Sequence, residues 1–238
     1  MKRLFLVAIL LASAGLGCTP LGCTPRQRDA GANDSPFQEE DTGYTLAFIF
    51  DLGPKYRDRV MGKDPIALKY ALDVKNTYFQ DRSDSPTDRL LIAQVSSLET
   101  AVLWDGKPRT FKREFPSPEK DLKDYLSSRT GDSKGPYLYT YDSVADTFDY
   151  LLKFRGKGKT AVLVFSEMTN KSPDPAKSRK HLVDSLAAYA KSGGHCAFYW
   201  LTWDTVRELE QIGKDAGLTF GTFVPDAVRD PVRPTFLD

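Results

Sequence analysis

Three long, almost uninterrupted apolar runs constrain the fold of this chain more than any other feature. They are TLAFIF at 45–50, TAVLVF at 160–165 and HCAFYWL at 195–201. Strands that read as continuous apolar runs are typical of parallel sheets, whose two faces are both covered by helices. Segments with a helical pattern of apolar residues separate the runs. The sequence therefore predicts an α/β domain with a mainly parallel sheet.

The remaining elements complete a sheet of about six strands with helices on both faces. Asp105-Gly106 is a turn signal that is expected to end the third strand, and Ser143 is expected to cap a helix after a loop at 131–140. We expect one domain over residues 44–238. Further strands are predicted at 89–96, 100–104 and 218–224, and helices at 64–80, 118–128, 143–154, 174–191 and 204–216.

The first residues have the pattern of a bacterial secretory signal. A basic head, Met1-Lys2-Arg3, precedes an apolar run of 13 residues at 4–16. A transmembrane helix needs about 20 apolar residues, so the run fits the hydrophobic region of a signal peptide better. The pentapeptide LGCTP then occurs twice, at 16–20 and at 21–25.

The small residues before each cysteine resemble the lipobox of bacterial lipoproteins, in which the cysteine is diacylated and becomes the mature N-terminus. The resemblance implies lipidation of Cys18. Gly15 departs from the usual Leu at the third position before the cysteine, and Cys23 has Pro20 at that position. The alternatives are cleavage after Ala14, which would release a soluble secreted or periplasmic form, and an uncleaved membrane anchor.

Lipidation would divide the chain into a signal peptide at 1–17, a linker at 18–43 and the folded domain. The linker is polar and rich in Gly, Pro, Asp and Asn, which is the composition of a disordered tether. A flexible chain of this length spans roughly 30 Å root-mean-square, so the domain would hang clear of the membrane. We therefore expect an exported protein of the bacterial cell envelope, anchored by its N-terminal lipid.

Charge and metal-ligating residues exclude some classes of function. Lys and Arg total 33 against 32 Asp and Glu, so no basic field indicates nucleic-acid binding. Two histidines do not make a His-rich metal site, and His181 lies in AKSRKH, which is typical of a solvated helix face. The three cysteines fit neither a zinc spacing nor a disulfide framework. We expect no cofactor.

The order and spacing of the elements resemble a von Willebrand factor type A (vWA) domain over roughly 44–225. Residues 88–106, DRLLIAQVSSLETAVLWDG, are similar to the second strand and antiparallel hairpin of that family. Residues 158–170, GKTAVLVFSEMTN, resemble its fourth strand and the following loop, and 44–55, YTLAFIFDLGPK, its first strand and metal loop. The resemblance implies a single Rossmann-like domain with one antiparallel edge strand.

In the vWA family the first loop reads Asp-x-Ser-x-Ser. Together with a Thr and an Asp from two other loops it holds Mg²⁺, and the metal binds a carboxylate of a partner protein. Here Asp51 is retained, but Gly53 and Lys55 stand at the two serine positions. Lys55 brings an ammonium group where a hard cation needs oxygen ligands. The resemblance thus implies a degenerate metal-ion-dependent adhesion site, with Asp51 its only retained ligand position.

The resemblance places the remaining positions of this site in two later loops. The loop threonine corresponds to Thr140, with Asp142 close by. The fourth-strand position falls on Ser166 or on Glu167, two readings that differ by a shift of one residue. Metal-independent binding is the expectation, and Mg²⁺ at Asp51 is the alternative.

Asp51 also stands out from the residues alone. Carboxylates seldom lie fully buried without a partner, so Asp51 should lie where its strand emerges, at the sheet edge where α/β folds bind ligands. The structural alternative is that Asp51 caps a nearby turn or pairs with Lys55. The segment 81–85, DRSDS, matches Asp-x-Ser-x-Ser literally, but it precedes a strand and is read as an ordinary loop.

Two classes of function fit these residues. The first is a non-enzymatic protein that binds an unidentified protein or envelope component through the loops around Asp51. The second is an enzyme, because FIFDLG is similar to the haloacid dehalogenase phosphohydrolases, in which a strand ends in a nucleophilic Asp. That family needs a second Asp two residues later, where this chain has Gly53. We expect binding, with a phosphohydrolase using Asp51 as the alternative.

Overall fold

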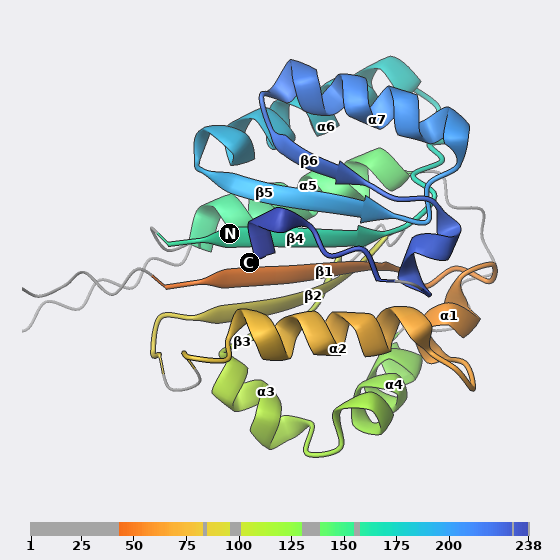
Figure 1. Ribbon diagram of the computed structural model, residues 1–238. Helices are drawn as coiled ribbons and strands as arrows, with labels where there is room; N and C mark the ends of the chain where they lie inside the picture. Colours follow the sequence, from red (N-terminus) through yellow and green to blue (C-terminus); the bar gives the residue numbers. More distant parts are fainter. Residues whose placement is uncertain are drawn as a thin grey trace, which may run out of the picture. The chain divides into compact units, whose positions relative to one another are not determined.

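The computed structural model describes residues 43–82, 85–95, 101–129, 139–154, 158–229 and 231–237. The six strands within these ranges pair in the order β3-β2-β1-β4-β5-β6 (Figure 1). All neighbouring strands are parallel except β2 and β3, which are antiparallel at one edge of the sheet. The predicted sheet is confirmed. The strands are β1 Thr45–Asp51, β2 Arg89–Val95, β3 Val102–Gly106, β4 Thr160–Phe165, β5 Gly194–Tyr199 and β6 Thr219–Thr222.

Helices cover both faces of the sheet (Figure 1). One face packs against α1 to α4, and the other packs against α5 to α7. No helix among the described residues is long and apolar enough to cross a bilayer. The helices are α1 Arg57–Met61, α2 Ile66–Tyr78, α3 Pro108–Glu114, α4 Pro118–Arg129, α5 Thr140–Phe154, α6 Pro175–Lys191 and α7 Trp203–Ala216, with short 3₁₀ turns η1 Pro225–Val228 and η2 Thr235–Leu237.

The alternation of side chains along β1 explains why its apolar run is nearly continuous. Leu46 and Phe50 belong to the core beneath α1 to α4, whereas Ala47 and Ile49 belong to the core beneath α5 to α7. All four are fully buried. Burial of a large apolar side chain contributes about 1.5–3 kcal/mol, so a strand with two apolar faces holds both helix layers on the sheet.

Two features of the chain differ from the sequence-based expectation. Ser143 does not cap α5, because the helix begins at Thr140 and the Ser143 hydroxyl donates to the Tyr139 carbonyl one turn earlier. Asp105 and Gly106 do not form a turn after the third strand but are the last two residues of β3, where the Asp105 carboxylate pairs with Arg89 of the neighbouring antiparallel strand. The ion pair and the strand pairing outweigh the local turn preference.

Two short helices were not predicted from the sequence. Helix α1 follows the loop after β1, and α3 begins with Pro108 at its first turn. The rings of Phe111 and Phe115, one helical turn apart on and just after α3, both pack against Trp104. Such short segments depend on tertiary packing, so their local sequence carries a weak signal. The proposed signal peptide, Cys18 and most of the linker lie outside the described residues.

Candidate functional site

A pocket of about 220 Å³ lies where β1 and β4 end, at the carboxyl edge of the sheet. Six of the seven predicted binding residues line it, and Asp142 is the exception. The parallel register explains the meeting, because Phe50 of β1 is level with Phe165 of β4 and the two loops therefore start side by side. We call it the strand-end pocket; its lining residues are Asp51, Gly53, Lys55, Tyr56, Thr140, Ser166, Glu167, Thr169 and Lys171.

Asp51 is the buried acid of this pocket, with 7% of its surface exposed. Its Oδ1 accepts a hydrogen bond from the Gly53 N–H at 3.0 Å, and its Oδ2 accepts one from the Ser166 hydroxyl at 3.2 Å. Burial raises the pKa of Asp51 to about 6, because the two hydrogen bonds only partly offset the loss of water around the charge. The carboxyl group can therefore gain or lose a proton near neutral pH.

Ser166 connects Asp51 to the loop after β4. Its hydroxyl oxygen accepts a hydrogen bond from the Met168 N–H at 3.0 Å while its proton points to Asp51. Met168 has a φ of 56°, and Trp200, just after β5, has a φ of 71°. Positive φ is uncommon outside glycine, and such residues persist where the surrounding structure holds them. The loops after β4 and β5 are thus fixed in defined conformations at this edge.

Lys55 and Glu167 form an ion pair across the mouth of the pocket. The Lys55 side chain is 68% exposed, whereas the Glu167 side chain is 20% exposed. Burial alone would raise the pKa of Glu167, but hydrogen bonds from Lys55 and Tyr56 outweigh it and lower that pKa. Of the two structural alternatives for Asp51, the structure has the turn cap at Gly53 and not the pairing with Lys55, which pairs with Glu167.

Thr140 and Asp142 take different directions from the first turn of α5. Thr140 lines the strand-end pocket, and its hydroxyl donates to the Thr169 carbonyl at 2.9 Å. Asp142 instead faces α6, where it accepts a hydrogen bond from the Ser178 hydroxyl at 2.5 Å. Residues two apart on a helix point in different directions, which explains the separation.

Sequence reasoning missed three lining residues, Tyr56, Thr169 and Lys171. Thr169 and Lys171 follow β4, and Tyr56 follows the glycine and proline after β1. The sequence could have indicated these residues, because the loops that follow two adjacent parallel strands lie next to each other at the same edge of the sheet. Trp203 is 75% exposed and begins α7 just after the same edge of the sheet.

The strand-end pocket does not fit a Mg²⁺ ion. Asp51 offers one carboxylate and Ser166 one hydroxyl, but the two already hydrogen-bond to each other. Gly53 has no side-chain oxygen, and Glu167 is paired with Lys55. A second ammonium group, that of Lys171, also belongs to the lining. A hard divalent cation needs about six oxygen ligands, and the positive charges oppose it.

The Asp-x-Ser-x-Ser match at 81–85 directly precedes β2. It therefore lies at the amino end of the parallel strands, opposite the strand-end pocket. Arg82 there forms an ion pair with the buried Asp88, which also accepts a hydrogen bond from the Tyr44 N–H. Ser83 and Asp84 lie outside the described residues. The arrangement ties the start of β1 to the start of β2, in keeping with the reading of this segment as a loop.

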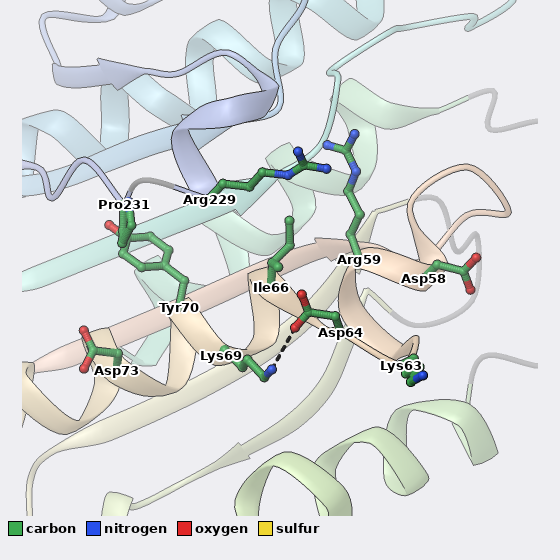
Figure 2. Close-up of a pocket in the computed structure, with 10 residues that line it drawn as sticks. All are labelled: Asp58, Arg59, Lys63, Asp64, Ile66, Lys69, Tyr70, Asp73, Arg229 and Pro231. Atoms are coloured by element: carbon green, nitrogen blue, oxygen red, sulfur yellow. Dashed lines mark hydrogen bonds and ion pairs between the residues drawn. The ribbon is translucent and has the colours of Figure 1, made fainter.

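A larger groove of about 1000 Å³ lies between α1, α2 and the C-terminal segment (Figure 2). None of the predicted site residues lines it. Acids and bases alternate around it, and Asp64 pairs with Lys69 at 2.7 Å. The Arg59 guanidinium also lies over the rings of Tyr56 and Trp200. Because positive and negative side chains are mixed around the groove, its charge does not indicate a particular class of ligand. The lining residues are Asp58, Arg59, Lys63, Asp64, Ile66, Lys69, Tyr70, Asp73, Arg229 and Pro231.

Comparisons with known proteins bear on the fold. No family model and no curated protein matches the sequence. The crystal structure of the TFIIH p34 N-terminal domain matches with a TM-score of 0.52 at 14% identity, over 83% of this chain and 93% of that one. The pilus adhesin SpaC from Lactobacillus rhamnosus GG matches with a TM-score of 0.49 at 12% identity, over 81% of this chain and 30% of that one.

A third solved structure, BatB from Bacteroides thetaiotaomicron, has a TM-score of 0.45 at 10% identity, over 79% of this chain and 93% of that one. Identities this low speak to the fold alone, and the match to the TFIIH p34 domain, a vWA-fold protein, carries the comparison. The described part of this chain therefore has a vWA-like α/β fold, with a mostly parallel six-stranded sheet and one antiparallel edge strand.

Proposed function

We propose that this chain is an exported, lipid-anchored protein whose vWA-like domain binds another protein or a cell-envelope component through the strand-end pocket, without a metal ion. The observation that carries the proposal is the convergence of Asp51, Lys55, Thr140 and Ser166 on one pocket at the ligand-binding edge of the fold.

The charges of the pocket favour a partner with an acidic group. Lys55 is exposed, and Lys171 lines the same pocket. Glu167 neutralises one of these ammonium groups, and Asp51 loses its negative charge when it is protonated below about pH 6. A carboxylate of a partner would then meet a net positive pocket directly, with Lys55 standing where a vWA domain with the full motif has an oxygen ligand for its metal.

The exposed Trp203 adds an apolar anchor to the same edge of the sheet. Tryptophan is enriched among the residues that contribute most to protein interfaces. The partner would then bind at two places, with an acidic group in the strand-end pocket and an apolar group against the Trp203 ring.

In vivo photo-crosslinking tests this binding face. A photoreactive amino acid at position 171 should capture a discrete partner from the native cell envelope, and Lys55→Glu should reduce the yield at least tenfold by reversing the pocket charge. Lys120→Glu, the same change at an exposed residue of α4, should leave the yield unchanged. Equal yields from the wild type and from Lys55→Glu would contradict the proposed site.

The proposed lipidation of Cys18 is tested separately. Metabolic labelling with a radioactive fatty acid should label the wild type and not Cys18→Ala, because only a cysteine at the mature N-terminus is diacylated. Cys23→Ala should keep the label. A label that is lost from Cys23→Ala instead would move the processing site, and an unlabelled wild type would favour the soluble exported form.

An enzymatic alternative is tested separately. A phosphohydrolase of the haloacid dehalogenase type would need Asp51 as nucleophile, yet Asp51 is buried and accepts hydrogen bonds on both oxygens. Phosphatase activity with Mg²⁺ that disappears in Asp51→Asn would support the enzyme. We propose that no such activity exists, and that Asp51 shapes a binding pocket.

A further inference from the structure

A second group of polar side chains lies between α5 and α6. His181 on α6 faces three aspartates of α5. Its Nε2 is 3.2 Å from an Asp149 oxygen and 3.9 Å from an Asp146 oxygen. Its Nδ1 is 3.3 Å from an Asp142 oxygen. The residues lie on two helices that pack against each other along the same face of the sheet.

Asp142 orients the histidine. The Asp142 carboxylate accepts a hydrogen bond from the Ser178 hydroxyl through one oxygen and faces His181 Nδ1 through the other. A neutral histidine that donates from Nδ1 to Asp142 has its Nε2 lone pair directed at Asp146 and Asp149. Histidines that bind metals are typically held in this way, with the distal ring nitrogen donating to a carboxylate.

The three remaining ligand atoms are spaced for one metal ion. His181 Nε2 and one oxygen each from Asp146 and Asp149 all lie within 4.8 Å of one another. In a tetrahedral Zn²⁺ site with bonds of about 2.0–2.1 Å, the ligand atoms lie about 3.3 Å apart. The Asp146 side chain is 65% exposed, and binding of the ion would require its carboxylate to move closer to the other two ligand atoms. Two carboxylates also balance the charge of a divalent ion.

We propose that Asp146, Asp149 and His181 bind a divalent transition-metal ion, with Zn²⁺ as the best-fitting probe and Asp142 as the residue that positions the histidine. The imidazole ligand favours Zn²⁺ over Mg²⁺ and Ca²⁺, which prefer oxygen ligands alone. Three protein ligands leave one position of a tetrahedral ion open to water or to a ligand group. The site is separate from the strand-end pocket and does not depend on the function proposed for it.

The competing account is a metal-free ion pair. Partial burial would lower the pKa of His181, but hydrogen bonds to Asp149 and Asp142 outweigh it and raise that pKa. A protonated His181 could then bridge α5 and α6 with no metal. The two accounts differ in what Zn²⁺ does near pH 8, where a protonated histidine readily loses its proton to the solvent and its ring nitrogen can then bind the metal.

Isothermal titration of the EDTA-stripped, full-length chain with Zn²⁺ at pH 8 tests the proposal. We expect one ion per chain in the wild type, a weakening of at least tenfold in His181→Gln and in Asp149→Asn, and no change in His195→Gln, which alters the other histidine. A thermal-unfolding midpoint that rises by a few degrees with saturating Zn²⁺ should accompany binding. Mg²⁺ at the same concentration should have neither effect.

Each alternative outcome overturns the proposal. Failure of the wild type to bind Zn²⁺ would leave only the ion pair between the helices. Binding that is equally strong in His181→Gln and Asp149→Asn would place the ion elsewhere, for example on the N-terminal cysteines. Circular dichroism of both variants in EDTA checks that a loss of binding does not reflect a loss of fold.

Discussion

At the scale of single residues, the properties of the strand-end pocket depend on the protonation of Asp51. The carboxylate is buried and has a Gly53 N–H and a Ser166 hydroxyl for partners, but no direct ion pair with a residue that the structure describes. Lys55, the cation in the loop directly after Asp51, is paired with Glu167. Because the charged form is poorly compensated, keeping Asp51 ionised costs folding free energy that a neutral side chain would not cost.

We predict that the free energy of unfolding falls as the pH rises from about 4 to 6, and that Asp51→Asn removes this fall. The folded-state pKa of Asp51 is about 6 against an ordinary value of 3.8, so in this window the folded protein holds a proton that the unfolded chain has released. The cost reaches about 3 kcal/mol above pH 6 at most. Urea unfolding at pH 4 and pH 8 measures it.

In that experiment Asp51→Asn should be about 1–3 kcal/mol more stable than the wild type at pH 8 and no more stable at pH 4. Ser166→Ala is the matched control, because it removes a hydrogen bond to the charged form and should widen the fall with pH. Parallel pH profiles for the wild type and Asp51→Asn would mean that Asp51 is solvated and outside a closed pocket.

At the scale of elements, α6 directly follows the β4 loop that lines the strand-end pocket, and it contains the histidine of the proposed metal site. The helix begins after Asp174, whose carboxylate accepts a hydrogen bond from the Lys177 N–H at 3.1 Å. Asp174→Ala should lower the free energy of unfolding by about 1 kcal/mol, because one N–H of the first turn then loses its acceptor. Asp174→Ser should restore most of the loss, and chemical denaturation of the three proteins decides the matter.

The contact between α5 and α6 should also depend on pH when EDTA removes metals. The pKa of His181 is raised above its ordinary 6.5, so its pairing with the aspartates stabilises the fold below that pH and is lost as the pH rises through the folded-state pKa. His181→Gln should therefore destabilise the protein more at pH 6 than at pH 9. An equal loss at both values would show that the side chain contributes by packing alone.

The strands were predictable from the sequence, whereas the short helices and one strand end were not. Continuous apolar runs such as 160–165 have few alternatives to a buried strand. Helix α3 depends on aromatic packing against Trp104, and Asp105 stays in β3 because Arg89 lies across from it. Contacts between residues far apart in sequence decided these cases, and local patterns do not contain them.

The candidate site was predictable as far as strand order fixes it. Asp51 and Ser166 meet because Asp51 ends β1 and Ser166 directly follows β4, and the two strands are adjacent and parallel. The direction of Asp142 was not foreseen, because it depends on where α5 begins and on the position of α6. For the same reason the facing of His181 toward three aspartates could not be inferred from AKSRKH, which shows only its own helix.

At the scale of the whole molecule, we propose that an exported, lipid-anchored N-terminus precedes the vWA-like domain, and that the pocket at one edge of its sheet binds a partner. The central claim is that this pocket works without a divalent cation. It rests on Gly53, which has no side-chain oxygen, on the ammonium group of Lys55, and on the pairing of Glu167 with Lys55. The proposed Zn²⁺ site between α5 and α6 is a separate matter, since Mg²⁺ should not bind there.

The first measurement is thermal unfolding of the EDTA-stripped, full-length chain at pH 7.5, without added metal and in a series of Mg²⁺ concentrations. We expect the wild type and Asp51→Ala each to keep its own midpoint, unchanged by Mg²⁺, even though the two midpoints differ from each other. An ion at 100 times its dissociation constant would add about 2.7 kcal/mol, which is a shift of a few degrees. A Mg²⁺-dependent rise in the wild type that is absent from Asp51→Ala would show a working metal site and contradict the account.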